Sequence, residues 1–281
     1  AAPSSPPFSM ARAQPVLCGH SRIPMKLATL KDGSRDGQLI VVSRDLGTAH
    51  FATGIAQRLQ QALDDWNFIA PQLQDVYDAL NLGRARHPFP FDPARCMAPL
   101  PRAYQWIEGD AYSSPADRVP EGSATIPWLR QCASDDLLGP CDDIAPNDAG
   151  IDFGAQLAAI VADVPAGATP EQGLDAVRLL MLANAISLPP QAGERETASF
   201  AEGFQTRLAT AFGPVAVTPE ELGDAWQDGR VHLTLQTTWN GRKVGLCDAG
   251  ADMRWAFGDL VAHAARHRRL RAGQPLIQPI P

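Results

Sequence analysis

The sequence predicts an α+β fold that is mostly β, with a small N-terminal domain of strands and helices before a larger strand-rich domain. Two apolar runs around a Gly/Asp-rich turn predict a β-hairpin within residues 25–50. Residues 231–250 alternate between apolar and polar around Asn240-Gly241, a strong signal for a type I′ hairpin turn. The proline-rich stretch 87–104 interrupts both periodicities and predicts the connection between the two domains.

This division gives three segments. Residues 1–24 contain five prolines and lack the continuous apolar core of a secretory signal, so we expect a disordered extension and an original start at Met25. We place the small N-terminal domain at 25–93. The strand-rich domain is then expected at 94–281.

Helices are expected after the first hairpin and at two threonine residues. Residues 55–63 and 73–80 carry apolar side chains at helical spacing, and Gly83 follows the second segment as a stop signal. The stretches TPEQGLDA and TPEELGDAW each place proline at the first helical position after a threonine. Gln172 and Glu221 stand where a capping box needs a side-chain acceptor, so both stretches predict short helices.

The second domain supplies two further strands and a terminal helix. The segments GIDFGAQLAAIV (150–161) and VRLLMLANAIS (177–187) are typical of buried strands. Residues 255–273 predict an amphipathic helix whose basic end complements the helix dipole and which Gly273 stops. The last eight residues, QPLIQPIP, include three prolines, so we expect that they cannot pair as a central strand.

Composition and charge restrict the class of partner. The chain has 281 residues, 45% of them hydrophobic, which is long enough to bury one large core or two smaller ones. The formal net charge of −7 argues against non-specific binding to nucleic acid or to an anionic membrane, and the sequence has no apolar stretch of about 18 residues that could span a bilayer. The five cysteines form no C-x-x-C pair, which suits a reducing compartment, so we expect a cytoplasmic protein.

Other motifs that carry chemistry have less support. His263 and His267 stand four residues apart, a spacing that zinc sites use, but the neighbouring arginines favour a solvated cationic helix end. The cysteines lie in no activating motif, and we interpret them as structural. The sequence contains no G-x-S-x-G elbow, P-loop or G-x-G-x-x-G loop, so it does not support a serine hydrolase, an NTPase or a dinucleotide-binding protein.

Seven motifs together resemble the fumarylacetoacetate hydrolase family, in its bacterial form with a small N-terminal β domain. They are KDGSRDGQLIVVSRD, LQQALDDWNFIAPQLQDVYDAL, FPFDPARCMAPLPRAYQW, DDLLGPCDD, GIDF, ATAFGPVAVTPEELGDAW and LQTTWNGRKVG. The resemblance covers residues 25–110, 135–188 and 205–273. It implies a mixed β-roll in the C-terminal domain, a dimer, and Mg²⁺- or Ca²⁺-dependent hydrolysis of a carbon–carbon bond in β-diketo acids, in aromatic catabolism.

The resemblance also implies a metal site whose residues differ here. The family places a Glu-x-Glu pair on one strand, so that both carboxylates reach one ion, and an Asp on a following strand. The corresponding positions in this sequence are Gly154, Gln156 and Ala185. Asp152 shares the strand face of the first two and could offer one carboxylate, but we interpret it as a hydrogen-bonded strand-end residue. We therefore expect no bound Mg²⁺ or Ca²⁺.

The residues that activate water and polarise the substrate differ as well. The family uses a His and a Glu three residues apart, and the matching positions here are Pro115 and Asp117. The family's polarising lysine corresponds to Arg207, which keeps the charge but changes the donor geometry. The family also continues with further strand-forming residues after LRAG, so we expect the C-terminal domain to be truncated.

Three hypotheses about function remain open. The first is a degenerate homologue, a pseudoenzyme without metal-dependent hydrolysis. The second is an enzyme with altered, metal-free hydrolase, isomerase or decarboxylase chemistry on a small keto acid. In it Arg207 holds the substrate carboxylate, and proton transfer falls to Tyr112, Asp117 or Gln156. The third is a structural partner of an intact paralogue. For the chain itself we expect a homo-oligomer, most simply a dimer, with no nucleic-acid or membrane partner.

Overall fold

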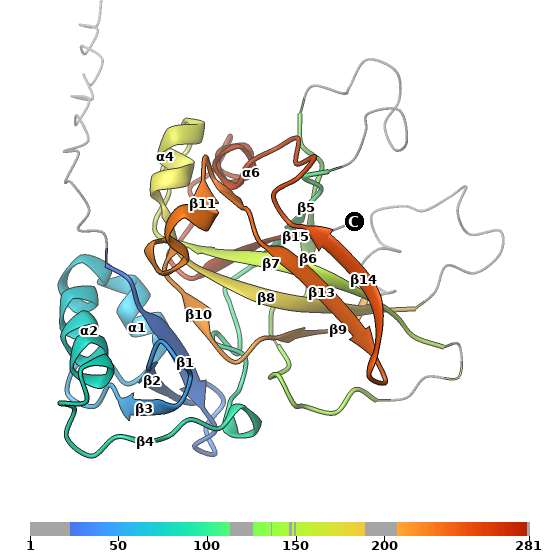
Figure 1. Cartoon of the computed structure of the whole chain (residues 1–281). Helices are drawn as coiled ribbons and strands as arrows, with labels where there is room; N and C mark the ends of the chain where they lie inside the picture. The colour runs from blue at the N-terminus through green and yellow to red at the C-terminus, as the bar shows by residue number, and fades with distance from the viewer. Residues whose placement is uncertain are drawn as a thin grey trace, which may run out of the picture.

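The computed structural model describes residues 23–112, 126–135, 137–145, 148, 150–188 and 207–279 (Figure 1). Within these residues an eleven-stranded mixed sheet runs through both halves of the sequence, so the fold is α+β and mostly strand, as predicted. The strands in sheet order are β4 (Phe89–Pro90), β3 (Thr48–Phe51), β2 (Gln38–Val42), β1 (Lys26–Leu30), β10 (Ala216–Val217), β8 (Val177–Ser187), β7 (Asp152–Val161), β15 (Gln274–Pro279), β5 (Trp106–Gly109) and β6 (Leu129–Cys132), with β9 (Arg207–Phe212) paired to β8.

The first hairpin forms between β1 and β2, as the sequence predicts. Its antiparallel ladder begins with Lys26 opposite Val42. Gly37 ends the turn with φ of +58°, and a Cβ there would lie 2.6 Å from the Leu30 carbonyl oxygen, so the position requires glycine. Two helices follow this hairpin, α1 (Leu59–Asp64) and α2 (Trp66–Asn81).

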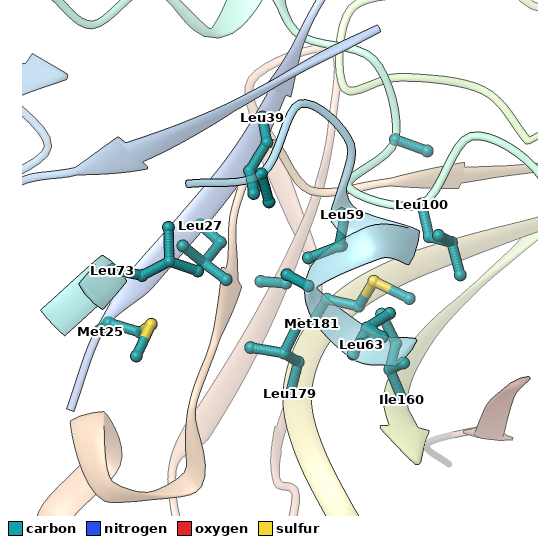
Figure 2. Packing of buried hydrophobic residues seen from close by; sticks show 14 of the residues in the cluster. Met25, Leu27, Leu39, Leu59, Leu63, Leu73, Leu100, Ile160, Leu179 and Met181 are labelled. Carbon is teal, nitrogen blue, oxygen red and sulfur yellow. The ribbon is translucent and has the colours of Figure 1, made fainter. Parts of the chain in front are cut away.

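The helices and both halves of the sheet share one hydrophobic core (Figure 2). Leu59 and Leu63 from α1 and Leu73 from α2 belong to this cluster. Ile160 of β7 and Leu179 of β8 enter it from the C-terminal half of the chain. Replacing one such buried leucine by alanine costs about 2–5 kcal/mol. The N-terminal segment is therefore packed into the same body as the rest of the described chain.

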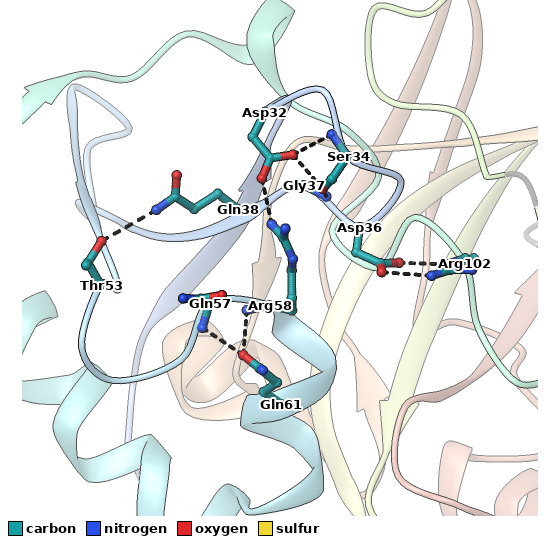
Figure 3. A network of polar contacts seen from close by, with 10 residues as sticks. All are labelled: Asp32, Ser34, Asp36, Gly37, Gln38, Thr53, Gln57, Arg58, Gln61 and Arg102. Carbon is teal, nitrogen blue, oxygen red and sulfur yellow. Dashed lines mark hydrogen bonds and ion pairs between the residues drawn. The ribbon is translucent and has the colours of Figure 1, made fainter.

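A network of polar contacts fixes the turn of the first hairpin (Figure 3). The Asp32 carboxylate accepts a hydrogen bond from the Ser34 N–H at 2.8 Å and pairs with Arg58 at 2.7 Å, directly before α1. Asp36 forms a bidentate ion pair with Arg102, with N···O distances of 2.7 and 2.8 Å. These contacts tie the turn to α1 and to the segment that leads into β5.

Part of the sheet curls into a roll, which consists of β6, β5, β15, β7, β8 and β9. Its two edges meet just beyond β6, where the Leu138 N–H donates to the Thr210 carbonyl and the Phe212 N–H donates to the Leu138 carbonyl, both at 2.9 Å. Trp106 of β5 contacts Phe212 of β9 with ring centroids 5.9 Å apart. The concave, inner face of the roll therefore gathers side chains from strands that lie far apart in the sheet order.

The segment after Gly273 is a central strand, and the prediction that it could not be one was wrong. β15 pairs antiparallel with β7 on one side and parallel with β5 on the other. Pro275 and Pro279 are four residues apart, so both missing N–H groups face the same edge of the strand. The pairing with β5 involves Leu276 and Ile277, between the prolines. Each proline therefore removes a donor from one ladder and leaves the other ladder intact.

Helices also form at two of the places expected in the C-terminal half, and one of them is shorter than expected. α4 (Pro170–Asp175) carries the predicted capping box: the Gln172 N–H donates to Thr169 Oγ1 at 3.3 Å, and the Thr169 N–H donates to Gln172 Oε1 at 3.0 Å. α6 (Phe257–Ala264) ends well before Gly273. Gly273 instead precedes β15 with φ of +86°.

The second threonine stretch forms a 3₁₀ helix, η3 (Pro219–Ala225), in place of the expected capped α-helix. Glu221 does not cap it. The buried Glu221 carboxylate accepts a hydrogen bond from Tyr77 Oη at 2.8 Å and lies 3.3 Å from Lys26 Nζ and 3.5 Å from Arg44 Nε. These partners all come from the N-terminal half, so the acid that the capping pattern singled out joins the two halves of the chain instead.

A second hairpin lies against the outer face of the roll (Figure 1). β13 (Thr234–Trp239) and β14 (Arg242–Asp248) pair as predicted, and Asn240 and Gly241 both have positive φ, 47° and 79°, as a type I′ turn requires. Trp239 stacks on Phe153 of β7 with ring centroids 4.9 Å apart.

None of the described helices combines the length and apolar character that a membrane crossing needs. The remaining short elements are η1 (Pro93–Arg95), β11 (Trp226–Gln227) and β12 (Arg230–Val231).

Candidate functional site

Buried polar side chains gather toward one end of the roll's inner face. Alternation along the strands puts Glu108 of β5, Gln156 of β7 and Thr210 of β9 on this face. They are 5%, 2% and 1% exposed, respectively. Because burying polar groups is costly unless they form hydrogen bonds, a fold that places three of them in one interior offers a candidate site there.

Two arginines converge on one carboxylate oxygen of Glu108. Arg130 stands opposite Glu108 in the β5–β6 ladder, and its Nη2 and Nε lie 2.8 and 3.2 Å from Glu108 Oε2. Arg207, at the start of β9, places its Nη2 2.5 Å from the same oxygen. The Glu108 and Arg207 side chains are 6% and 10% exposed. The cluster therefore holds two positive charges and one negative charge, with limited access to water.

Cys132 lies beside this cluster. Its Sγ is 3.6 Å from Glu108 Oε2. Burial raises the pKa of the Cys132 thiol to about 11, and the Glu108 charge adds to this effect while the two arginines oppose it. Cys132 is therefore a neutral thiol at physiological pH and is unsuited to act as a nucleophile.

Three polar atoms of the roll interior have no hydrogen-bond partner among the described residues. They are Gln156 Oε1, Thr210 Oγ1 and Trp106 Nε1. The first is an acceptor, the second can donate or accept, and the third is a donor. All three atoms are buried, so they add unpaired polar groups to the interior but do not face open space.

The positions where the resemblance implies metal ligands lie together on the inner face. Gly154 and Ala185 are cross-strand partners in the β7–β8 ladder, and Gln156 follows two residues along β7. A Cβ at Gly154 would meet no atom within 4 Å. Asp152 is exposed, and its carboxylate accepts a hydrogen bond from the Phe153 N–H at 2.9 Å.

The donors at these positions do not fit a hard divalent cation. Mg²⁺ and Ca²⁺ take several oxygen ligands, preferably carboxylates. The three inner positions offer one amide oxygen, and the nearby Glu108 carboxylate already binds two guanidinium groups. Among the described residues, no group of three or more His, Cys, Asp or Glu side chains could hold a metal ion. Pro115 and Asp117 lie outside the described residues.

The other candidates for proton transfer and substrate binding are divided between the two faces of the roll. Arg207 and Gln156 lie on the inner face. Tyr112 packs against the hydrophobic cluster of the outer face, where its hydroxyl donates to the Ala249 carbonyl. Burial raises the pKa of Tyr112 to about 12, and the nearby Cys247 and Asp248 contribute to the same effect. The structure therefore brings Arg207 and Gln156 into one interior but leaves Tyr112 outside it.

The two histidines considered for zinc do not share a helix. α6 ends at Ala264, so His263 belongs to it and His267 does not. Burial lowers the pKa of His263, and Arg266 and His267 lower it further. This surplus of positive charge supports the interpretation of a cationic helix end.

A separate cavity of about 290 Å³ lies on the outer face, between β7, β8 and the β13–β14 hairpin. Leu157, Leu180 and Leu235 are among its lining residues, and all the lining residues are uncharged. This cavity offers apolar packing surface but no acid, base or charged group. A larger cavity, of about 570 Å³, lies beside α1, and its lining includes the charged residues Asp36, Arg58 and Arg102.

Sequence reasoning did not single out Glu108, Arg130, Cys132 or Thr210. One signal was present for Glu108, which stands two residues after Trp106 in the apolar stretch WIEG. A charged residue on the same strand face as a buried tryptophan is unusual unless it is paired. The sequence around Arg130 and Cys132 carries no such signal, because these residues lie on a different strand from Glu108 and meet it only in the folded chain.

Two family models match the chain over most of its length. One, described as fumarylacetoacetase N-terminal domain 2, matches residues 25–102. The other, described as fumarylacetoacetate (FAA) hydrolase C-terminal, matches residues 108–277. No curated protein sequence matches the chain.

Solved structures share the fold at low sequence identity. The fumarylacetoacetate hydrolase of Exiguobacterium antarcticum is 19% identical with a TM-score of 0.65, over 92% of this chain and 87% of that one. The 2-hydroxyhepta-2,4-diene-1,7-dioate isomerase of Mycobacterium marinum is 18% identical with a TM-score of 0.61, over 92% and 87%. A maleylpyruvate hydrolase of Sphingobium, in complex with manganese(II) and pyruvate, is 17% identical with a TM-score of 0.64, over 91% of each chain. At these identities the likeness establishes the fold.

Proposed function

The chain belongs to the fumarylacetoacetate hydrolase family, and we propose that it is a member without metal-dependent hydrolysis of carbon–carbon bonds in β-diketo acids. The observation that carries the proposal is the inner face of β7 and β8. There Gly154, Gln156 and Ala185 stand at the positions where the resemblance implies the family's carboxylates, and the β7–β8 pairing puts them side by side. Without those carboxylates the site lacks ligands for a Lewis acid and for the water that the metal would activate.

The charge of the roll interior supports the same proposal. Two cationic side chains, Arg130 and Arg207, lie in this interior, and both pair with Glu108. Two like unit charges 4 Å apart repel each other by about 4 kcal/mol at an effective dielectric constant of 20, and a divalent ion doubles that effect. An interior of this charge disfavours a divalent cation, whereas a set of three carboxylates would attract one.

Metal titration and a hydrolysis assay test the proposal. In calorimetry we expect Mg²⁺, Mn²⁺ and Ca²⁺ to bind no more tightly than millimolar, because one amide oxygen is a poor ligand set for these ions. Incubation with acylpyruvates or fumarylacetoacetate, with and without Mg²⁺, is expected to leave the diketone absorbance unchanged. Metal-stimulated loss of that absorbance above a heat-treated control would overturn the proposal.

Restoring the carboxylates gives the reverse test. A triple variant, Gly154→Glu, Gln156→Glu and Ala185→Asp, is expected to bind Mn²⁺ more tightly than the wild type, because the three side chains face one interior and the space at position 154 is open. The matched control is the double variant Gly154→Gln and Ala185→Asn, which keeps Gln156 and so places amides of similar volume and no charge at all three positions. Equal Mn²⁺ affinity in the two variants would show that the three positions do not converge.

A second candidate is an enzyme with altered, metal-free chemistry on a small keto acid, as a hydrolase, isomerase or decarboxylase. Two inner-face groups favour it: the Arg207 guanidinium, which is suited to a carboxylate, and the Gln156 oxygen, which has no hydrogen-bond partner within the described part of the chain. Tyr112 does not favour it, because its hydroxyl is engaged on the outer face. Turnover of a keto acid in the presence of EDTA, lost in Arg207→Gln, would select this candidate.

We further propose that the chain assembles, as a homodimer or as the partner of an intact paralogue. Large apolar side chains around the outer cavity and on the β13–β14 hairpin stay about half exposed, which is typical of interfaces. They are Leu182, Leu233, Val244 and Leu246. In sedimentation, Leu246→Glu is expected to shift the chain toward monomer, whereas Leu82→Glu is not, although Leu82 at the end of α2 is similarly exposed (62% against 58%). A dilute wild-type monomer would contradict assembly, and copurification with a second family member would select the paralogue.

A further inference from the structure

The cavity beside α1, of about 570 Å³, lies where the two halves of the chain meet. Its lining comes from the turn of the first hairpin, the start of α1, the segment before β5 and the residues just after β6. Leu59 and Leu100 belong to this lining and are 2% and 3% exposed. The cavity therefore has an apolar, buried part of its wall at a junction of distant segments, a common place for a ligand site.

Ion pairs balance the charges on one side of this cavity (Figure 3). Asp36 pairs with Arg102 at 2.7 and 2.8 Å, and Asp32 pairs with Arg58 at 2.7 Å. Arg102 and, to a smaller extent, Arg58 lower the pKa of the Asp36 carboxyl, so the two pairs act on each other. Arg35 of the same turn does not line the cavity and is not among the charges that act on Asp36. These two pairs therefore sum to zero charge.

Asp135 adds a carboxylate that the two pairs do not neutralise. It lines the same cavity, it is exposed, and it has no hydrogen-bond or ion-pair partner within the described ranges. Two charged groups lie just behind the lining: Asp64 accepts a hydrogen bond from Gln60, and Arg268 donates one to Gln105. These two are of opposite sign. The described groups around the cavity therefore leave one negative charge over.

Tyr104 gives the cavity an accessible aromatic face. It is 68% exposed, and it follows Ala103, whose N–H donates to the Ser134 carbonyl at 2.8 Å. This hydrogen bond puts Tyr104 and Asp135 on adjoining segments, and both side chains line the cavity. The face of a tyrosine ring attracts a cation, and a carboxylate close to the ring adds to that attraction.

We propose that this cavity binds an organic cation of single positive charge with a compact apolar body, such as a quaternary ammonium compound. The cationic head meets the Tyr104 ring and the Asp135 carboxylate, and the body of the ligand packs against the apolar part of the wall. The charge count carries the choice, because the ion pairs cancel and Asp135 remains. An anion would be repelled by that carboxylate, and a dication would find one acid where it needs two. The site is separate from the inner face of the roll, so it does not depend on the proposed function.

Proton NMR titration with choline and 3,3-dimethyl-1-butanol tests the inference. The two probes have the same shape and hydroxyl group, and differ in that choline carries a charged nitrogen where the alcohol has a carbon. Wild-type protein is expected to bind choline about 3- to 10-fold more tightly than the alcohol. Tyr104→Leu, which keeps an apolar side chain but removes the ring, is expected to lower this preference to about 3-fold or less. Asp135→Asn is expected to weaken choline binding by about 3-fold and to leave alcohol binding unchanged.

Matched controls separate this site from the overall negative charge of the chain. Phe68→Leu removes a ring that is 69% exposed on α2, and Asp252→Asn removes an exposed carboxylate; neither residue lines the cavity. Both controls are expected to bind choline as the wild type does, and a thermal melt checks the folding of all four variants. Equal affinity of the wild type for the two probes would overturn the inference, as would no choline binding up to about 50 mM. An equal loss of choline binding in Asp252→Asn and Asp135→Asn would also overturn it, because attraction by net charge would then explain the binding.

Discussion

The substitution Glu108→Gln removes the negative charge that two arginines share and keeps the shape of the side chain. Glu108, Arg207 and Arg130 have side chains that are 6%, 10% and 23% exposed, so water screens their charges poorly. Removing one partner of a buried ion pair costs about 3–5 kcal/mol, because the other charge stays buried without compensation. The glutamine oxygen can still accept a hydrogen bond, so we expect a loss near the lower end, about 3 kcal/mol, in the free energy of unfolding.

Urea unfolding measures this loss as a shift of the midpoint at constant slope. Asp36→Asn is the matched control, because Asp36 also forms a short bidentate pair, with Arg102, but their side chains are 40% and 50% exposed (Figure 3). We expect that control to cost less than about 1 kcal/mol. The double variant Glu108→Gln/Arg207→Gln should recover part of the loss, since it also removes a buried cation. Equal costs for Glu108→Gln and Asp36→Asn would refute the reasoning.

Three further predictions concern pH, thiol reactivity and a turn. Burial and a neighbouring carboxylate raise the pKa of Tyr77 from 10 to about 12, so the stability from its protonated hydroxyl is complete below pH 10 and is lost as the pH rises to about 12. Tyr77→Phe should flatten that part of a stability profile, and an unchanged profile would contradict the assignment. At neutral pH iodoacetamide should alkylate the exposed Cys141 before Cys96, whose pKa burial raises to about 11, as peptide mass spectrometry would show. Gly37→Ala should cost more than about 2 kcal/mol in urea unfolding, because the new Cβ meets backbone, whereas Gly33→Ala, in open space, should cost about 1 kcal/mol.

The elements that the sequence predicted correctly carry their signals within a few residues. The Asn240-Gly241 turn and the Thr169 capping box are both local devices, and both form as expected. The failures depend on distant partners. Glu221 fits a capping box in sequence but instead meets Tyr77, Lys26 and Arg44, which only the folded chain brings close. β15 likewise becomes a central strand because it pairs with β7 on one side and with β5 on the other, and both of these strands are distant in the sequence.

The same division applies to the candidate site. Alternation along a strand places positions 154 and 156 on one face, and the structure adds Ala185 as the cross-strand partner of Gly154. The pair of Glu108 and Arg207 was not predictable, because 99 residues separate them and they meet only where the sheet curls. Local alternation therefore predicts which residues share a face, whereas the closure of the roll decides which faces meet.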